Sequence, residues 1–234
     1  MDITAIIASY KRPNLSIILE ALKGADIKEI WVINDDPDKH LELDGVAVFN
    51  NGKNLGCMGR TALAVMATTS HVLCHDDDVM IEGPETIANL MRWQLTYPEA
   101  IVGYYGRQCK WDSDKPYTDG LYMAGASYPD AQPINIIFAK MMLAKVSKYA
   151  QAWGLFAELN DYTVEEDVLT SMANLVAGYQ NYLIPAKKGQ RCLPLSEHGH
   201  SLSERQGFWE SRDAAVKCIV EGRWGEARAA LVAE

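Results

Sequence analysis

Short apolar runs alternate with amphipathic stretches over the first part of the chain. Four runs of strand length predict buried strands, at residues 3–9, 30–33, 46–49 and 71–74. A helical apolar pattern fills residues 14–22, and a helix of small residues is predicted at 60–69. Fully apolar strands separated by helices are typical of a parallel sheet covered on both faces. We therefore expect an α/β fold that binds its ligands beyond the carboxyl ends of the strands.

The second part of the chain has longer amphipathic helices and less regular strands. Helices are predicted at residues 85–96, 147–153, 165–177 and 208–220, with a short tail helix after them. Extended segments are predicted at 101–105, 134–138, 141–143 and 180–184. Residues 106–119 are predicted to form a loop or an irregular hairpin, and residues 185–205 a long loop. Because no repeat or linker interrupts this order, we expect one domain over residues 1–234.

The composition does not alter the predicted fold, but it limits the classes of molecule that the protein is expected to bind. The 22 basic and 31 acidic residues give a net charge of −9, which argues against a protein that holds DNA through its phosphates alone. A local basic surface is still available from Arg107, Lys110, Lys115, Lys187, Lys188 and Arg191. The five cysteines form no CxxC pair and are expected to be reduced. No membrane helix or signal peptide is apparent, so we expect a cytoplasmic protein, or one of the host cytoplasm if the source is viral.

Polar clusters follow three of the predicted strands. They are Ser9-Tyr10-Lys11-Arg12, Asn34-Asp35-Asp36 and Asp76-Asp77-Asp78. Three adjacent aspartates repel one another unless a cation lies among them, and a divalent cation can also clamp a diphosphate. Oxygen ligands favour Mn²⁺ or Mg²⁺ over zinc. The alternative is a solvated acidic turn, and the position directly after a buried strand favours the metal site.

Three further segments have residue types suited to chemistry. The loop from Asn54 to Arg60 (NLGCMGR) allows close backbone approach to a phosphate at a helix start, or is a flexible turn with a surface arginine. Glu165-Glu166-Asp167 opens a helix, where carboxylates commonly just complement the helix dipole. Asp167 lies at the edge of the buried stripe and is our candidate to stabilise a cationic transition state or contact an acceptor hydroxyl. His198 and His200 are either further metal ligands or ordinary surface residues.

The order of these motifs resembles the GT-A glycosyltransferases, and within them the exostosin-like family 64 enzymes. The similar segments are ITAIIASYKRP, WVINDDP, NLGCMGR, HVLCHDDDVMI, WQLTYPEAIVGYYGR, VSKYAQAW and VEEDVLTSMANLVAG, with a weaker similarity in GFWESR. They extend over residues 3 to 184 and, with GFWESR, reach the C-terminal region. The resemblance implies a GT-A (Rossmann-like) fold with a smaller acceptor-side subregion. It also implies a nucleotide-binding half at about residues 1–105 and an acceptor-binding and catalytic half at about 106–234.

The resemblance further implies transfer of a hexosyl or N-acetylhexosaminyl group from a nucleotide-sugar, with UDP-sugar as the expected donor, Mn²⁺ or Mg²⁺ as cofactor, and retention of configuration. The implied nucleotide-sugar contacts are Ser9, Tyr10, Arg12, Asn34, Asp35, Asn54, Arg60, Asp76 and Asp77. Asp78 is implied as the direct metal ligand and Asp167 as the catalytic carboxylate. The C-terminal arginine near the sugar is Arg212, with Arg205 as the alternative register.

The acceptor is left open by these residues. A glycan or another hydroxyl-bearing molecule is the first expectation, and a hydroxymethylated pyrimidine in viral DNA is the main alternative. Two other classes of function compete with transfer. A non-catalytic module that binds nucleotide-sugar requires the aspartate triplet alone, without the Glu-Glu-Asp helix start. A metal-dependent phosphohydrolase requires additional metal-binding or nucleophilic groups near the triplet, where His75 is the remaining candidate.

Overall fold

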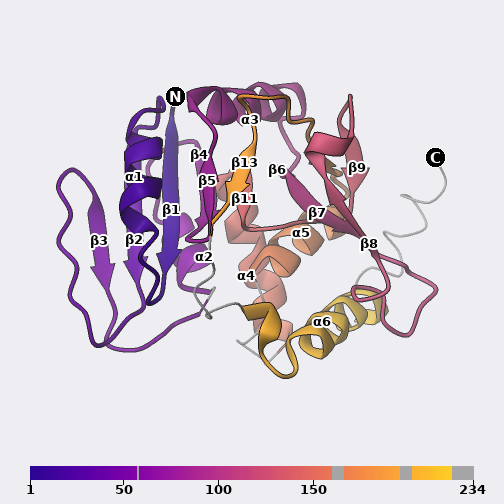
Figure 1. Ribbon diagram of the computed structural model, residues 1–234. Coiled ribbons are helices and arrows are strands. Elements are labelled where there is room, and N and C mark those ends of the chain that lie inside the picture. Colours follow the sequence, from indigo (N-terminus) through magenta and orange to yellow (C-terminus); the bar gives the residue numbers. More distant parts are fainter. Residues whose placement is uncertain (57, 160–165, 196–201, 223–234) are drawn as a thin grey trace.

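The computed structural model describes residues 1–56, 58–159, 166–195 and 202–222. Within these residues the main sheet has eight strands in the order β3-β2-β1-β4-β11-β6-β12-β9 (Figure 1). The strands are β1 (Ile3–Ser9), β2 (Glu29–Asn34), β3 (Ala47–Asn50), β4 (His71–Asp76), β6 (Val102–Gly103), β9 (Gln132–Ile134), β11 (Met141–Lys145) and β12 (Asn181–Leu183). β1 to β4 pair in parallel, as do β6 and β12, whereas β11 is antiparallel to β4 and β6. The predicted α/β fold with a mainly parallel sheet is confirmed.

Helices cover both faces of this sheet, as β1 illustrates. Ile3 and Ile7 pack in one core cluster with residues of α1 (Leu15–Lys23) and α3 (Pro84–Thr96). Ile6 packs in another cluster, with residues of α2 (Met58–Ala64) and α4 (Val146–Leu159). Successive strand residues point to opposite faces, so a strand buried on both sides is apolar throughout. This is why β1 and β4 were readable from sequence as unbroken apolar runs.

The carboxyl ends of the parallel strands share one rim. Ser9 lies opposite Asn34 in the β1–β2 register, and Asn34 lies opposite Asn50 in β2–β3. On the other side of β1, Ala8 lies opposite Asp76, the last residue of β4. The predicted convergence of the three polar strand ends is therefore confirmed.

A smaller antiparallel sheet, ordered β10-β7-β8, lies beside α5 (Glu166–Val176) and α6 (Phe208–Gly222) (Figure 1). Its strands are β7 (Tyr105–Gln108), β8 (Leu121–Ala124) and β10 (Ile136–Ile137). The prediction of one strand over 101–105 was wrong, because β6 ends at Gly103 and β7 begins at Tyr105. Backbones cross closely here: a Cβ on Gly103 would lie 2.6 Å from the Met141 carbonyl oxygen, and one on Gly106 2.3 Å from that of Ile136. For residues 106–119 the hairpin alternative of the prediction is confirmed, because β7 pairs antiparallel with β8 and residues 106–108 belong to β7.

Two other predictions differ from the structure, because contacts between segments distant in the sequence determine the secondary structure there. The segment 134–138 is divided at Asn135, whose side-chain oxygen accepts a hydrogen bond from Cys109 N at 2.7 Å. Within the predicted loop 185–205, β13 (Cys192–Pro194) pairs with β5 (Val79–Ile81). Each of these strands has at most three residues, too few for a periodic pattern.

Most predicted helices are present with shifted ends. α4 runs beyond the predicted 147–153, and α5 and α6 lie close to the predicted 165–177 and 208–220. α2 differs more, since it ends at Ala64 instead of residue 69. Met66 N and Ala67 N bond to carbonyls three residues earlier, and Thr69 turns inward to pair with the Thr4 hydroxyl at 2.8 Å. The predicted tail helix lies outside the described residues.

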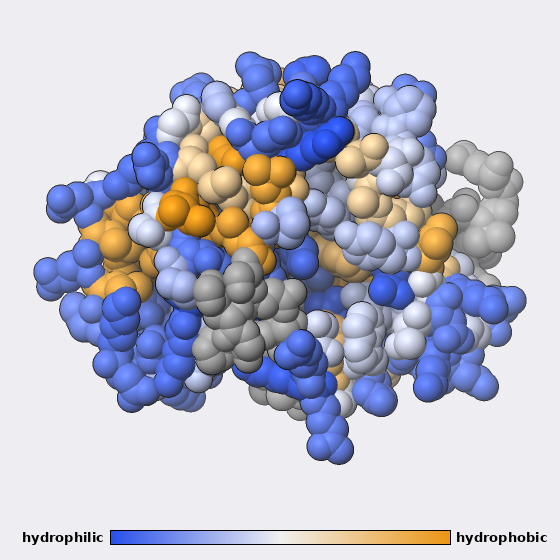
Figure 2. Space-filling model, viewed as in Figure 1, coloured by the Kyte–Doolittle hydropathy of each residue, from blue (hydrophilic) through white to orange (hydrophobic). Residues whose placement is uncertain are grey.

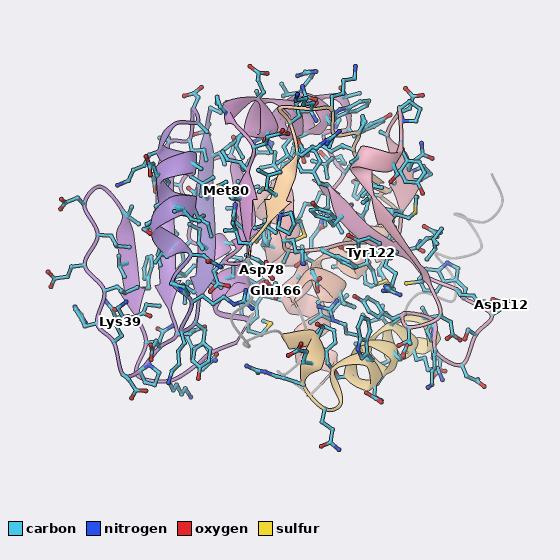
Figure 3. All side chains as sticks on the ribbon, in the orientation of Figure 1. Lys39, Asp78, Met80, Asp112, Tyr122 and Glu166 are labelled. Carbon is cyan, nitrogen blue, oxygen red and sulfur yellow. The ribbon has the colours of Figure 1, made fainter. Side chains whose placement is uncertain are left out.

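The molecular surface is mixed in character. Figure 2 shows apolar residues gathered on the face in view over α1 and the β5–β13 pair, where Ile17 and Leu193 are 43% and 36% exposed. Met80, labelled in Figure 3, is partly exposed in the same region. Among the described helices, none combines the length and apolar character that crossing a bilayer demands.

Candidate active site

The acidic turn after β4 lies at the rim where the parallel strands end. Asp76 closes β4, and Asp77 and Asp78 lead into β5. Asp77 and Asp78 are 7% and 8% exposed. Figure 3 places Asp78 near the centre of the view, in the same region as Glu166. Carboxylates this close together and this buried require cations beside them.

The turn between β1 and α1 supplies the first cation. Arg12 Nη1 lies 2.7 Å from Asp77 Oδ1 and 3.4 Å from Asp78 Oδ2. Tyr10 N donates to the other Asp77 oxygen at 3.1 Å, and Asn14 Nδ2 donates to the Asp77 carbonyl at 3.0 Å. Lys11 between them has the left-handed φ of 56°, which makes the turn tight enough for Tyr10 and Arg12 to reach the same carboxylate.

Arg60, in the first turn of α2, supplies the second cation. Its Nη1 donates to Asp76 Oδ1 at 2.7 Å and to the His75 carbonyl at 2.9 Å. Its Nε donates to Glu166 Oε1 at 2.7 Å, and Nη2 contacts the same oxygen. Arg60 and Glu166 are 2% and 1% exposed. A buried arginine thus joins the acidic turn to the first turn of α5.

The two ends of the acidic turn differ electrostatically. Burial acts to raise the pKa of Asp76, but the charge and hydrogen bond of Arg60, with the charge of Lys140, outweigh it and hold that pKa below its ordinary value. At Asp77 burial dominates and raises the pKa to about 6, against the opposing effects of Arg12 and the Tyr10 amide. The neighbouring Asp76 and Asp78 charges raise it further. Ionisation is therefore more costly at Asp77 than at Asp76.

Asp167 and Arg212 form a buried pair next to Arg60 and Glu166. Arg212 Nη2 lies 3.0 Å from Asp167 Oδ1 and Nη1 lies 3.3 Å from Oδ2. Arg212 Nη1 also contacts the Tyr117 hydroxyl, and its guanidinium carbon lies 4.6 Å from the centre of the Phe208 ring. Arg205, the other register considered for the C-terminal arginine, is exposed. The structure therefore brings Arg212, and not Arg205, to the predicted carboxylate.

Four other predicted nucleotide-sugar contacts, Asn34, Asp35, Asn54 and Ser9, lie at or after the ends of the parallel strands. Asn34 Nδ2 donates to Asn50 Oδ1 at 2.8 Å, and Asp35 Oδ1 accepts from Asn51 Nδ2 at 2.8 Å. Asn54 is exposed, and its side-chain oxygen caps Gly56 N at 2.7 Å. Ser9 is buried at the end of β1. The side chains of Asn34, Asp35 and Asn54 are thus bonded within the protein. Any contact that they make with the nucleotide is additional to these bonds.

The described residues contain no group of three or more His, Cys, Asp or Glu side chains that is arranged to hold a metal ion. His198 and His200 lie outside them. The acidic turn nevertheless suits Mn²⁺ or Mg²⁺, because its donors are carboxylate oxygens crowded in a partly dry site. Mg²⁺ is commonly bound by one or two carboxylates together with substrate phosphates. The residues therefore fit a metal whose remaining ligands come from a diphosphate.

Comparison of the sequence with family models identifies the family of this chain. The sequence model of the glycosyl transferase family 64 domain matches residues 4–173, which include β1, the acidic turn and Asp167. The chain belongs to glycosyl transferase family 64. No curated protein shows significant sequence similarity to it. As a family 64 member it is a glycosyltransferase, in agreement with the motif order in the sequence.

Solved structures support the fold of this family 64 chain. The mannosyltransferase PcManGT from Pyrobaculum calidifontis, in complex with GDP-Man and Mn²⁺, superposes with a TM-score of 0.53 at 16% identity, over 99% of this chain and 74% of that one. S. aureus TarS 1–349 superposes with a TM-score of 0.52 at 14% identity, over 80% of this chain and 59% of that one. The chain thus spans less than two thirds of the TarS fragment. At these identities the likeness concerns the fold alone.

Some groups of the family 64 site were not predicted from its sequence. Glu166 was passed over in favour of Asp167, yet both are buried in the first turn of α5. Asp213 was missed entirely: it accepts hydrogen bonds from the Tyr117 and Thr118 amides at 2.8 and 3.0 Å and so fixes the loop that carries Tyr117. The available signal was a carboxylate next to Arg212 on a predicted helix. Glu165 lies outside the described residues.

Proposed function

We propose that this glycosyltransferase moves a sugar from a nucleotide-sugar to an acceptor hydroxyl, with Mn²⁺ or Mg²⁺ as cofactor and with retention of configuration. The observation that carries the proposal is a pair of buried ion-paired groups whose acidic members are consecutive residues at the start of α5. The first group joins the acidic turn through Arg60 to Glu166, and the second joins Asp167 to Arg212. This arrangement supports the proposal, because it places the proposed catalytic carboxylate next in sequence to a residue that is paired with the acidic turn through Arg60.

On the donor side, Asp78 is proposed as the direct metal ligand. The metal would supply charge neutralisation at the diphosphate of the donor. Asp76 and Asp77, fixed by Arg60 and Arg12, would bind the sugar and ribose hydroxyls. UDP is the proposed nucleotide, and residues 1–105 are the proposed donor half. The GDP-Man complex of PcManGT supports a nucleotide-sugar with a divalent cation and makes GDP-sugars the first alternative.

On the catalytic side, Asp167 is proposed to stabilise the positive charge that develops on the transferred sugar. A fixed negative group in a water-poor site is effective because it needs no reorganisation during the reaction. Arg212 supports this role, because its fork contacts both oxygens of Asp167 and fixes their orientation.

Residues 106–234 are proposed to bind the acceptor. Trp209 and Tyr122 are 37% and 52% exposed, and Trp209 lies 6.1 Å from the Tyr117 ring that contacts Arg212. Exposed aromatic rings suit stacking on a sugar ring, and Trp209 is linked to the proposed catalytic carboxylate through Tyr117 and Arg212. A glycan acceptor is therefore preferred.

For a DNA acceptor the basic residues are poorly arranged. Arg107 Nη1 donates to three carbonyls of its own loop, those of residues 117, 118 and 120. Arg191 and Lys188 belong to a different loop, which is bonded to Glu82 and to Thr86 at the start of α3. Because Arg107 already donates to carbonyls of its own loop, it is less available to a phosphate, and a DNA acceptor remains the second proposal.

The proposal is tested by a screen of donors against acceptors. UDP-sugars and GDP-sugars are incubated with Mn²⁺ or Mg²⁺ and with oligosaccharides or hydroxymethylated DNA, and products are identified by mass spectrometry. We expect sugar transfer, or slow donor hydrolysis without acceptor, that a chelator abolishes. Donor binding with neither reaction would support a non-catalytic module. Transfer to hydroxymethylated DNA alone would replace the glycan acceptor, and activity that survives chelation would refute the metal requirement.

A further inference from the structure

Lys140 lies at the rim next to the acidic turn. It directly precedes β11, and its carbonyl accepts a hydrogen bond from Asp76 N at 3.4 Å. The following residue, Met141, lies opposite His75 in the β11–β4 register. Because β11 is antiparallel to β4, the beginning of β11 and the end of β4 are neighbours. The backbone of Lys140 is therefore fixed beside Asp76.

Lys140 differs from Arg12 and Arg60 in its ion pairing. Arg12 is paired with Asp77 and Asp78, and Arg60 with Asp76 and Glu166. Lys140 is half-buried, and within the described part of the chain its ammonium has no carboxylate within ion-pair distance. Among the described residues, Lys140 is thus the cation beside the acidic turn that has no carboxylate partner and could bind a ligand.

The charge of Lys140 acts on both the acidic turn and the small sheet. It opposes the effect of burial on the pKa of Asp76, and it does the same for the pKa of Tyr122 on β8. Tyr122, which Figure 3 labels, is 52% exposed, and its ring centre is 5.9 Å from that of Phe138. Lys140 thus stands on the boundary between the proposed donor and acceptor sides.

We propose that the Lys140 ammonium binds the diphosphate of the donor and stabilises the charge that the diphosphate gains on leaving. This inference rests on the proposed function. In the reaction the bond from the anomeric carbon to the diphosphate oxygen breaks, and its electron pair stays on that oxygen. The acceptor oxygen forms a bond to the same carbon, and its proton passes to the departing diphosphate.

The need for such a cation follows from the charges at the rim. The leaving diphosphate becomes more negative beside the carboxylates of the acidic turn, and Arg12 and Arg60 are already paired with those carboxylates. A cation held in place before the reaction stabilises the developing charge at little reorganisation cost. Lys140 meets this need because its backbone is fixed beside Asp76 and its ammonium has no carboxylate partner within the part of the chain that the structure describes.

The test compares Lys140→Met, which removes the charge at similar length, with Lys140→Arg. The control is Lys145→Met, at the other end of β11, where the lysine pairs with Glu99 at 2.6 Å. Binding of UDP and of GDP, each with MnCl₂, is measured by calorimetry, and kcat and KM for donor and acceptor are measured in the transfer assay. Circular dichroism and thermal unfolding establish that each variant is folded.

We expect Lys140→Met to weaken nucleoside diphosphate binding by about tenfold or more, the usual effect of losing a hydrogen bond between charged groups. It should also lower kcat, whereas uridine or guanosine binding is unchanged. Lys140→Arg should recover most of the affinity, and the control should resemble the wild type. Unchanged diphosphate binding with a raised acceptor KM would assign Lys140 to the acceptor and overturn the proposal, as would no change in either. Failure of the wild type to bind either diphosphate would instead refute the proposed function, and this inference with it.

Discussion

The guanidinium of Arg212 pairs with both carboxylate oxygens of Asp167, across 45 residues of sequence and between the first turn of α5 and the second turn of α6. Each side chain is 6% exposed. Removing two charges from water is costly, and the cost is recovered only when the pair has good geometry and further partners. Tyr117 provides such a partner to Arg212, and the amide of Val168 donates to Asp167 Oδ1 at 2.8 Å. The pair is therefore rigid, which suits a group that must face a developing charge.

Replacing Asp167 by asparagine should abolish most transfer while preserving donor binding. The amide keeps the shape of the carboxylate but loses its charge, so kcat should fall by about a hundredfold or more. Donor affinity, measured by calorimetry with MnCl₂, should stay near the wild-type value. Asp112→Asn serves as the control, because Asp112 is an exposed loop residue that Figure 3 places at the edge of the molecule. Wild-type turnover in Asp167→Asn would remove this residue from the mechanism.

Stability should reveal the coupling within the Asp167–Arg212 pair. Arg212→Met leaves Asp167 buried without its partner and should lower the free energy of unfolding by about 3–5 kcal/mol. Combining it with Asp167→Asn should cost less than the sum of the two single changes, because the uncompensated charge is gone. Urea unfolding of the four proteins measures the cycle. Strict additivity would mean that the two groups do not interact in solution.

Glu166 is expected to matter for stability as much as for activity. Arg60 Nε and Nη2 both donate to Glu166 Oε1, and the arginine is otherwise held by Asp76 and the His75 carbonyl. Glu166→Gln removes one charge of a buried pair and should cost about 3 kcal/mol in the free energy of unfolding. Asp38→Asn breaks the exposed pair with Lys11 and should cost at most about 1 kcal/mol. Similar small effects in both variants would argue against a tight Arg60–Glu166 contact.

The polar residues at the rim could be predicted because their signal lies in the local sequence pattern. Buried parallel strands are apolar throughout, so the polar residues that end them, Ser9, Asn34 and Asp76, stand out in the sequence and must meet at one edge. Arg60 was predicted as a nucleotide-sugar contact or as a surface arginine, and the structure shows it buried and paired with Asp76. The role of Arg60 in binding the nucleotide-sugar donor remains a prediction.

The rest of the site depends on contacts that no local pattern encodes. α5 is buried on all sides, so periodicity does not separate Glu166 from Asp167. The choice between Arg205 and Arg212 is made by the packing of α6 against α5, far from either in sequence. The division of the apolar run at Tyr104 likewise follows from close backbone crossings at Gly103 and Gly106.

Asp77 should make the stability of the metal-free protein depend on pH. Burial raises its pKa to about 6 in the folded state, whereas an aspartate in the unfolded chain ionises near pH 3.9. Between these values the folded protein holds a proton that the unfolded chain has lost. The free energy of unfolding should therefore decrease as pH rises through this window, by up to about 3 kcal/mol, and this contribution should level off above about pH 6.

Asp77→Asn isolates this effect, because every other titrating group is common to both proteins. Urea unfolding from pH 4 to pH 7 without divalent cations should show a stability difference between wild type and variant that grows with pH. Saturating Mn²⁺ should reduce the difference, since a cation beside the carboxylates favours their ionised form and binds more tightly as pH rises. Equal pH dependence in the two metal-free proteins would contradict the raised pKa. A difference that Mn²⁺ leaves unchanged would place the metal away from the acidic turn.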